Sequence, residues 1–189
     1  MAADNGQRRE LRNETAVNVA GLLKAQVGAA RSYDLVLDEL VVDDETTARD
    51  ITGVVRLTRL RDGVMAHAAA EGSTTLTCVR CLREYEQPFA IELDEEYRQT
   101  VDVRTGIDLG LDSVDDEQAS RIDENHELDL REPLRQEIVV SLPMRPDCGE
   151  ECPGPDLAVI GGQTDEDLVD DRLAALARLL ADDRDNVTD

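Results

Sequence analysis

Four cysteines form two close pairs, Cys78 with Cys81 and Cys148 with Cys152, and the sequence contains no other cysteine. Two thiolates with two or three residues between them at a tight turn can bind the same ion, and structural zinc sites take four such ligands in a tetrahedron. The spacing therefore predicts one structural Zn²⁺ site built from both pairs. Two alternatives stay open: the thiols bind nothing, or the C-x-x-C pair does redox chemistry, which favours a position at a helix N-terminus.

The other reactive residue types form no recognisable catalytic set. His67 falls in an alternating strand pattern and His126 in an acidic stretch, so we interpret each as an ordinary surface or packing residue. The sequence has no serine-hydrolase elbow, no phosphate-binding glycine loop and no zinc-protease motif. We therefore expect a protein that is not an enzyme. The alternative is a cytosolic oxidoreductase or nuclease that uses the C-x-x-C pair.

The first cysteine pair falls among segments in which apolar and polar residues alternate. This alternation predicts strands at 31–40, 51–60, 64–70, 74–78 and 88–97. Asp62-Gly63 is a two-residue hairpin signal, because glycine tolerates the positive φ of a type I′ turn. Cys78 and Cys81 then lie in the turn between the last two strands.

The second pair follows a predicted helix that begins at Asp129 and ends before Pro143. Leu130, Leu134 and Ile138 recur at about one turn each, and Glu132 completes a capping-box pattern with Asp129. Shorter helices are predicted after Asn18 and after Thr164. The expected fold class is α+β: an antiparallel β-meander of about five strands, two or three short helices and a cysteine knuckle.

Composition divides the chain into three parts. Residues 1–17 are polar and aperiodic and are predicted to be a disordered leader, and residues 183–189 a polar tail. Residues 18–182 are predicted to form a single α+β domain. A mobile acidic loop is expected at about 104–126, because so few apolar groups cannot offset the entropy lost on ordering.

The charge of the chain restricts its partners. The 43 acidic and 20 basic side chains give a formal net charge of −23, which argues against autonomous binding to DNA or RNA and favours a basic partner. With one Phe and no Trp, base-stacking platforms are not expected. The sequence has no apolar run of about 20 residues and no signal peptide, so we expect a cytoplasmic protein without a membrane partner.

Several sequence motifs resemble those of the bacterial YceD family, the large ribosomal RNA subunit accumulation proteins. They are Asn18-Val19-Ala20, the turn CVRCL at 78–82, the run EIVVSLPM at 137–144, and Cys148 followed by Cys152-Pro153-Gly154. Many relatives continue with a further cysteine pair, whereas this chain reads GPDLAVIGG at 154–162. The resemblance therefore implies a metal site only if Cys148 and Cys152 replace that pair.

The resemblance also implies a function. YceD proteins resemble small cytoplasmic factors without catalytic activity that support synthesis, processing or stability of large-subunit ribosomal RNA. Combined with the acidic charge, this implies contact with a basic ribosomal protein or a large-subunit precursor. Direct RNA contact stays open, since it would require Arg80 and Arg83 to form a local basic patch with Arg56 and Arg59.

Overall fold

The computed structural model describes residues 8–109 and 120–155. The chain divides into two units, Met1–Cys152 and Pro153–Asp189, and every described strand and helix belongs to the first unit. The predicted helix after Thr164 and the polar tail at 183–189 lie outside the described residues. So does 110–119, the middle of the predicted acidic loop.

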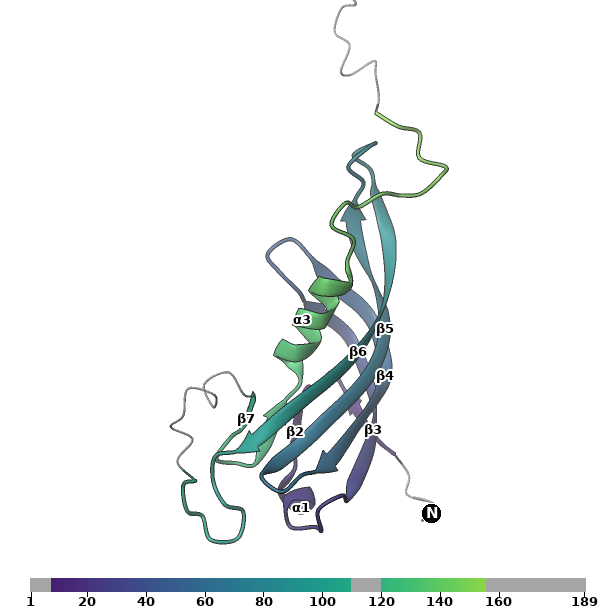
Figure 1. The fold of residues 1–189 in the computed structure, drawn as a ribbon. Helices are drawn as coiled ribbons and strands as arrows, with labels where there is room; N and C mark the ends of the chain where they lie inside the picture. The colour runs from purple at the N-terminus through teal and green to yellow at the C-terminus, as the bar shows by residue number, and fades with distance from the viewer. Residues whose placement is uncertain (1–7, 110–119, 156–189) are drawn as a thin grey trace, which may run out of the picture. The chain divides into compact units, whose positions relative to one another are not determined.

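Six strands form one curved sheet, whose four long members follow one another along the chain (Figure 1). Antiparallel pairing links β3 (Ala30–Val41), β4 (Thr47–Arg59), β5 (Gly63–Thr77) and β6 (Glu84–Gln99). Two short strands add to this sheet by parallel pairing: β1 (Arg9–Arg12) beside β3 and β7 (Ser120–Ile122) beside β6. The sheet is therefore mixed, with a parallel strand at each edge.

The smaller elements complete the fold on one side of the sheet. A second, two-stranded sheet pairs β2 (Ala16–Asn18) with β8 (Glu127–Asp129). Within the described ranges the helices are α1 (Ala20–Leu23) and α3 (Arg131–Ser141). Neither is long and apolar enough to cross a membrane.

The predicted fold class, an α+β antiparallel meander of about five strands with two or three short helices, is wrong. The described part of the chain is mostly β, and its main sheet is mixed rather than antiparallel throughout. The predicted strands at 64–70 and 74–78 belong to one strand, β5, because the residues between them, including Gly72, are also part of that strand. A Cβ at Gly72 would lie 2.8 Å from Phe89 Cζ, so glycine here leaves room for the aromatic ring of the next strand.

Two short strands lie in or beside the stretch predicted to be a disordered leader. β1 and β2 each bury one apolar side chain, Leu11 and Val17, in the common core. Asn13, between them, donates from Nδ2 to Asp38 Oδ2 over 2.8 Å and accepts the Asp38 N–H over 2.8 Å. These contacts attach the segment to β3.

Strand alternation places the core on one face of the main sheet. One row of paired residues crosses four strands, from Tyr33 through Val55 and Ala68 to Leu93, and all four side chains are buried. Side chains of the intervening positions point to the opposite face. The aliphatic core therefore lies between the inner face of the sheet and α3.

Helix α3 packs on β6 and β3 through Leu134 and Ile138, both fully buried. Its start matches the prediction in part: Asp129 Oδ1 accepts the Arg131 N–H over 2.9 Å. Glu132 does not close a capping box, because its carboxylate binds the Arg135 guanidinium over 2.6 Å. The helix ends at Ser141, where Leu142 turns into an extended conformation before Pro143.

Tyr97 makes the fold sensitive to alkaline pH. Its side chain is buried and its hydroxyl donates to the Asp129 carbonyl over 2.8 Å, while burial raises its pKa. In the unfolded chain a tyrosine ionises near pH 10. The contribution of protonated Tyr97 to the free energy of unfolding is therefore fully present below that pH and is lost as the pH rises above it. Tyr97→Phe should cost about 1 kcal/mol at pH 7 and show a smaller loss between about pH 8 and pH 11 in urea unfolding. Parallel pH profiles of variant and wild type would contradict this assignment.

Candidate metal centre

The first cysteine pair lies in the turn that joins the two longest strands, β5 and β6. Cys78 follows directly on β5, and its N–H donates to the Arg83 carbonyl over 2.9 Å to close the end of the hairpin. The Leu82 N–H returns to the Cys78 carbonyl over 2.9 Å, and the Arg80 N–H donates to Cys78 Sγ over 3.4 Å. These bonds fold the turn tightly and hold both sulfurs on its inner side.

The second pair lies in the segment that follows α3. Asp147 Oδ1 accepts the Gly149 N–H over 2.8 Å, and the Cys152 N–H donates to the Gly149 carbonyl over 3.2 Å. Gly149 has a φ of 96°, a backbone conformation that favours glycine. This turn brings Cys148 and Cys152 to the same side of the segment.

Two contacts join the segments that carry the two pairs. The Val79 N–H donates to the Pro146 carbonyl over 3.0 Å, and the Arg80 guanidinium lies 3.1 Å from Asp147 Oδ2. Both contacts connect a residue between the first two cysteines with a residue just before Cys148. The turn and the post-helix segment are therefore aligned by bonds other than those of the sulfurs.

All four sulfurs lie within 4.8 Å of one another. Cys78 Sγ is 3.8 Å from Cys152 Sγ, and Cys81 Sγ is 3.7 Å from Cys148 Sγ. Four sulfurs at about 2.3 Å from one tetrahedral ion would be separated by about 3.8 Å, so the two cross-pair distances fit a zinc ion. Cys78 is buried and the other three cysteines are half-buried.

Backbone donors favour a thiolate at one of the four positions. The N–H groups of Cys81 and Cys148 stabilise the charged form of Cys78 and lower its pKa to about 6. Hydrogen bonding between thiols has the opposite effect on Cys148, whose pKa is raised to about 12, chiefly by Cys152. The backbone donors therefore favour a thiolate at Cys78, and a bound cation would favour loss of the protons from the other thiols.

The structure brings together the four cysteines that their spacing grouped. Among the described residues this is the cluster with metal-binding geometry, and neither histidine belongs to it. His67 Nδ1 lies 2.7 Å from Asp94 Oδ1 on the outer face of the sheet, and His126 occupies the turn before β8. The sequence did not indicate the contacts that Pro146 and Asp147 make with Val79 and Arg80. These contacts arise only in the tertiary fold.

A family model described as "Large ribosomal RNA subunit accumulation protein YceD" matches residues 66–180, more than half of the chain. The chain belongs to the YceD family. This confirms the resemblance seen in the sequence motifs. In this YceD protein the match includes all four cysteines, α3, β6 and β5 from residue 66 onward. Comparisons with curated proteins and with solved structures gave no match.

Proposed function

We propose that the four cysteines of this YceD protein bind one structural Zn²⁺. The sulfur–sulfur distances of 3.7 and 3.8 Å carry this proposal, because they equal the edge of a tetrahedral zinc–thiolate site of about 3.8 Å. Two cysteines contributed by a β-hairpin and two by a post-helix turn are a ligand set that zinc favours. Bound zinc would neutralise part of the thiolate charge and fix the β5–β6 turn to the end of α3.

The ligand set supports a structural role for the metal rather than a catalytic one. A catalytic zinc keeps one position open for water or substrate, whereas here four sulfurs lie within 4.8 Å of one another and could fill all four positions. Thiol redox chemistry favours a C-x-x-C at a helix N-terminus, but Cys78 and Cys81 lie in a turn between two strands. Both observations favour a protein without catalytic activity over an oxidoreductase or nuclease.

We propose further that the protein is a cytoplasmic accessory factor that supports accumulation of large-subunit ribosomal RNA. The family assignment carries this proposal. With a net charge of −23, contact with a basic ribosomal protein, alone or in a large-subunit precursor, is electrostatically favoured over contact with bare RNA. In this proposal the zinc centre stabilises the scaffold and the acidic surface selects the partner.

Depletion of the protein in the cells that produce it tests the role in ribosomal RNA. We expect the ratio of large-subunit to small-subunit ribosomal RNA to fall and unprocessed large-subunit precursor to accumulate on northern blots. Re-expression of the wild type should restore the ratio, and Cys78→Ser with Cys148→Ser should restore it poorly. An unchanged ratio after complete depletion would contradict the proposal.

A further inference from the structure

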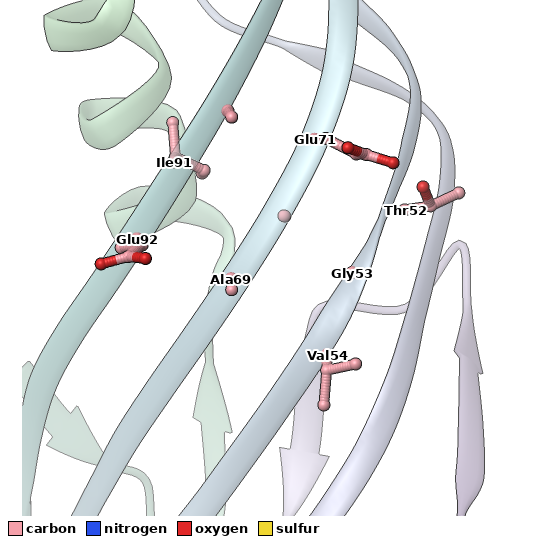
Figure 2. A pocket seen from close by; sticks show the side chains of 9 residues that line it. Thr52, Gly53, Val54, Ala69, Glu71, Ile91 and Glu92 are labelled. Carbon is pink, nitrogen blue, oxygen red and sulfur yellow. The ribbon is translucent and has the colours of Figure 1, made fainter.

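A shallow depression lies on the outer face of the main sheet, away from α3 and from the cysteines. It has a volume of about 570 Å³ and spans three strands, β4, β5 and β6 (Figure 2). The outward-facing residues at its centre are small, Ala69 and Ala90, and leave accessible the backbone of Gly53 and Ala70, whose side-chain positions face the core. Three adjacent strands with almost no side-chain volume make a surface on which another chain can approach closely.

Beneath the depression, β4 and β5 are packed closely on the core side of the sheet. A Cβ at Gly53 would lie 2.3 Å from the Ala69 carbonyl oxygen and 2.8 Å from Ala70 Cα. A larger residue at position 53 is therefore incompatible with the sheet. Val54, which is 38% exposed, is the largest apolar side chain that lines the depression from β4.

Two carboxylates flank this small-residue surface. Glu71 on β5 and Glu92 on β6 are exposed and lie diagonally across the strand pair, because Ala69 is the register partner of Glu92. Diagonal neighbours of this kind are roughly 7–8 Å apart, and their Cβ atoms are somewhat closer. The nine residues that line the depression include these two acids and no cation.

Glu71 and Glu92 differ from three other acids on the outer face. Asp34, Asp94 and Glu96 on the same face each lie within 4.0 Å of a basic nitrogen, of Arg8, His67 and Arg98 respectively. Among the residues that the structure describes, no cation pairs with Glu71 or Glu92. Two unpaired anions beside an accessible backbone thus favour a positively charged ligand.

We propose that this depression is the docking surface for a Lys/Arg-rich segment of a partner protein. Two cations about 7 Å apart, as at positions i and i+2 of an extended chain, would reach Glu71 and Glu92, and the backbone between them would pass over Ala69. The proposal deepens the proposed function and rests on it for the identity of the partner, a basic protein of the large subunit. RNA is disfavoured here, since its phosphates would meet both carboxylates.

Peptide binding tests the surface independently of ribosomal RNA. The probe is a fluorescent 12-residue peptide of alternating Lys and Ala, titrated with the full-length protein and followed by anisotropy. Glu71→Lys with Glu92→Lys should weaken binding about tenfold. Asp44→Lys with Glu45→Lys, in the β3–β4 loop, gives the same net charge of −19 and should change the affinity less than about twofold. Equal losses in the two double variants would overturn the proposal.

The shape of the depression is tested without a change of charge. Ala69→Gln fills its centre and should weaken peptide binding about fivefold. Thr75→Gln, an exposed position on the same strand and the same face but outside the depression, is the matched control and should leave the affinity unchanged. Full binding by Ala69→Gln would show that the peptide does not enter the depression and would refute the proposal.

Cross-linking identifies the occupant. A photoreactive benzoylphenylalanine replaces Val54 in the full chain, which is then mixed with proteins extracted from purified large subunits. A cross-linked Lys/Arg-rich peptide of one ribosomal protein, lost in the Glu71→Lys and Glu92→Lys variant, supports the proposal. Cross-links to a second copy of the chain or within the chain itself overturn it. So do cross-links to ribosomal RNA when whole large subunits replace the extracted proteins.

Complementation separates the failure of this inference from failure of the proposed function. If depletion lowers large-subunit ribosomal RNA and the Glu71→Lys, Glu92→Lys variant restores it fully, the function stands and the docking surface is refuted. If depletion has no effect but the peptide results are as expected, the surface stands and the ribosomal role is refuted.

Discussion

Cys148→Ser is expected to remove the zinc and to lower the free energy of unfolding by about 4 kcal/mol. The metal joins two turns that are separated by 66 residues, and a cross-link that closes a loop of this length restricts the unfolded chain by about that amount. For a domain of this size, the melting temperature should fall by about 10 °C. Metal analysis of tag-free protein should give about one zinc per wild-type chain and none in the variant.

Met144→Ser is the matched control for this prediction. Met144 lies in the same post-helix segment, four residues before Cys148, and its side chain is fully exposed. Its replacement should leave the zinc content unchanged and alter stability by less than about 0.5 kcal/mol. A chelator should lower the melting temperature of the wild type to that of Cys148→Ser and have no effect on the variant.

Two results would contradict the zinc centre. One is wild-type protein that contains no zinc and takes up none on refolding with zinc chloride. The other is a Cys148→Ser variant with an unchanged melting temperature and lost thiol exchange, the outcome expected of a redox site. The lowered pKa of Cys78 agrees with either chemistry, so the metal content is the deciding measurement.

The cysteine grouping could be predicted because it depends on local turns. A turn between two strands is enough to bring Cys78 close to Cys81. In the same way, a tight loop after α3 is enough to bring Cys148 close to Cys152. The meeting of the two pairs depends on the packing of α3 on β6, which no local pattern specifies. The presence of two close pairs and the absence of other cysteines indicated it instead, whereas the family resemblance pointed to a later cysteine pair that this chain lacks.

The hairpin signal at Asp62-Gly63 was informative for a similar reason. A two-residue turn fixes the register of its strands, and Leu60 and Gly63 indeed close the β4–β5 connection with a bond of 3.0 Å. The predicted role of Gly63 is wrong, because it has no positive φ and is the first residue of β5, so that the loop consists of Arg61 and Asp62. Glycine is required at this position for a different reason. A Cβ at this position would lie 1.9 Å from the Tyr97 carbonyl oxygen of the next strand.

The parallel edge strands could not be predicted from the sequence. β1 has one buried residue, Leu11, among Arg9, Glu10 and Arg12, and a three- or four-residue strand shows no measurable alternation. Its position is determined by pairing with β3, about 24 residues further along the chain. The outer-face depression was equally hidden, because Val54 and Ala69 become neighbours only through the β4–β5 register.

Ile138→Ala in α3 is expected to lower the free energy of unfolding by about 3 kcal/mol. Ile138 is fully buried between the helix and the sheet, and truncation of such a side chain removes apolar contacts and leaves a cavity. Val140→Ala, on the exposed side of the same helix, should cost less than about 0.5 kcal/mol. Urea unfolding with saturating zinc measures both.

The same variant tests whether the core and the metal centre stabilise the domain independently. Ile138 is ten residues from Cys148 and is not a ligand, so Ile138→Ala should retain about one zinc per chain. Because zinc then binds the folded state equally well, a chelator should reduce the stability of the variant and of the wild type by the same amount. A larger reduction in the variant would show that α3 packing also sets the metal affinity, since the helix positions the segment that carries Cys148 and Cys152.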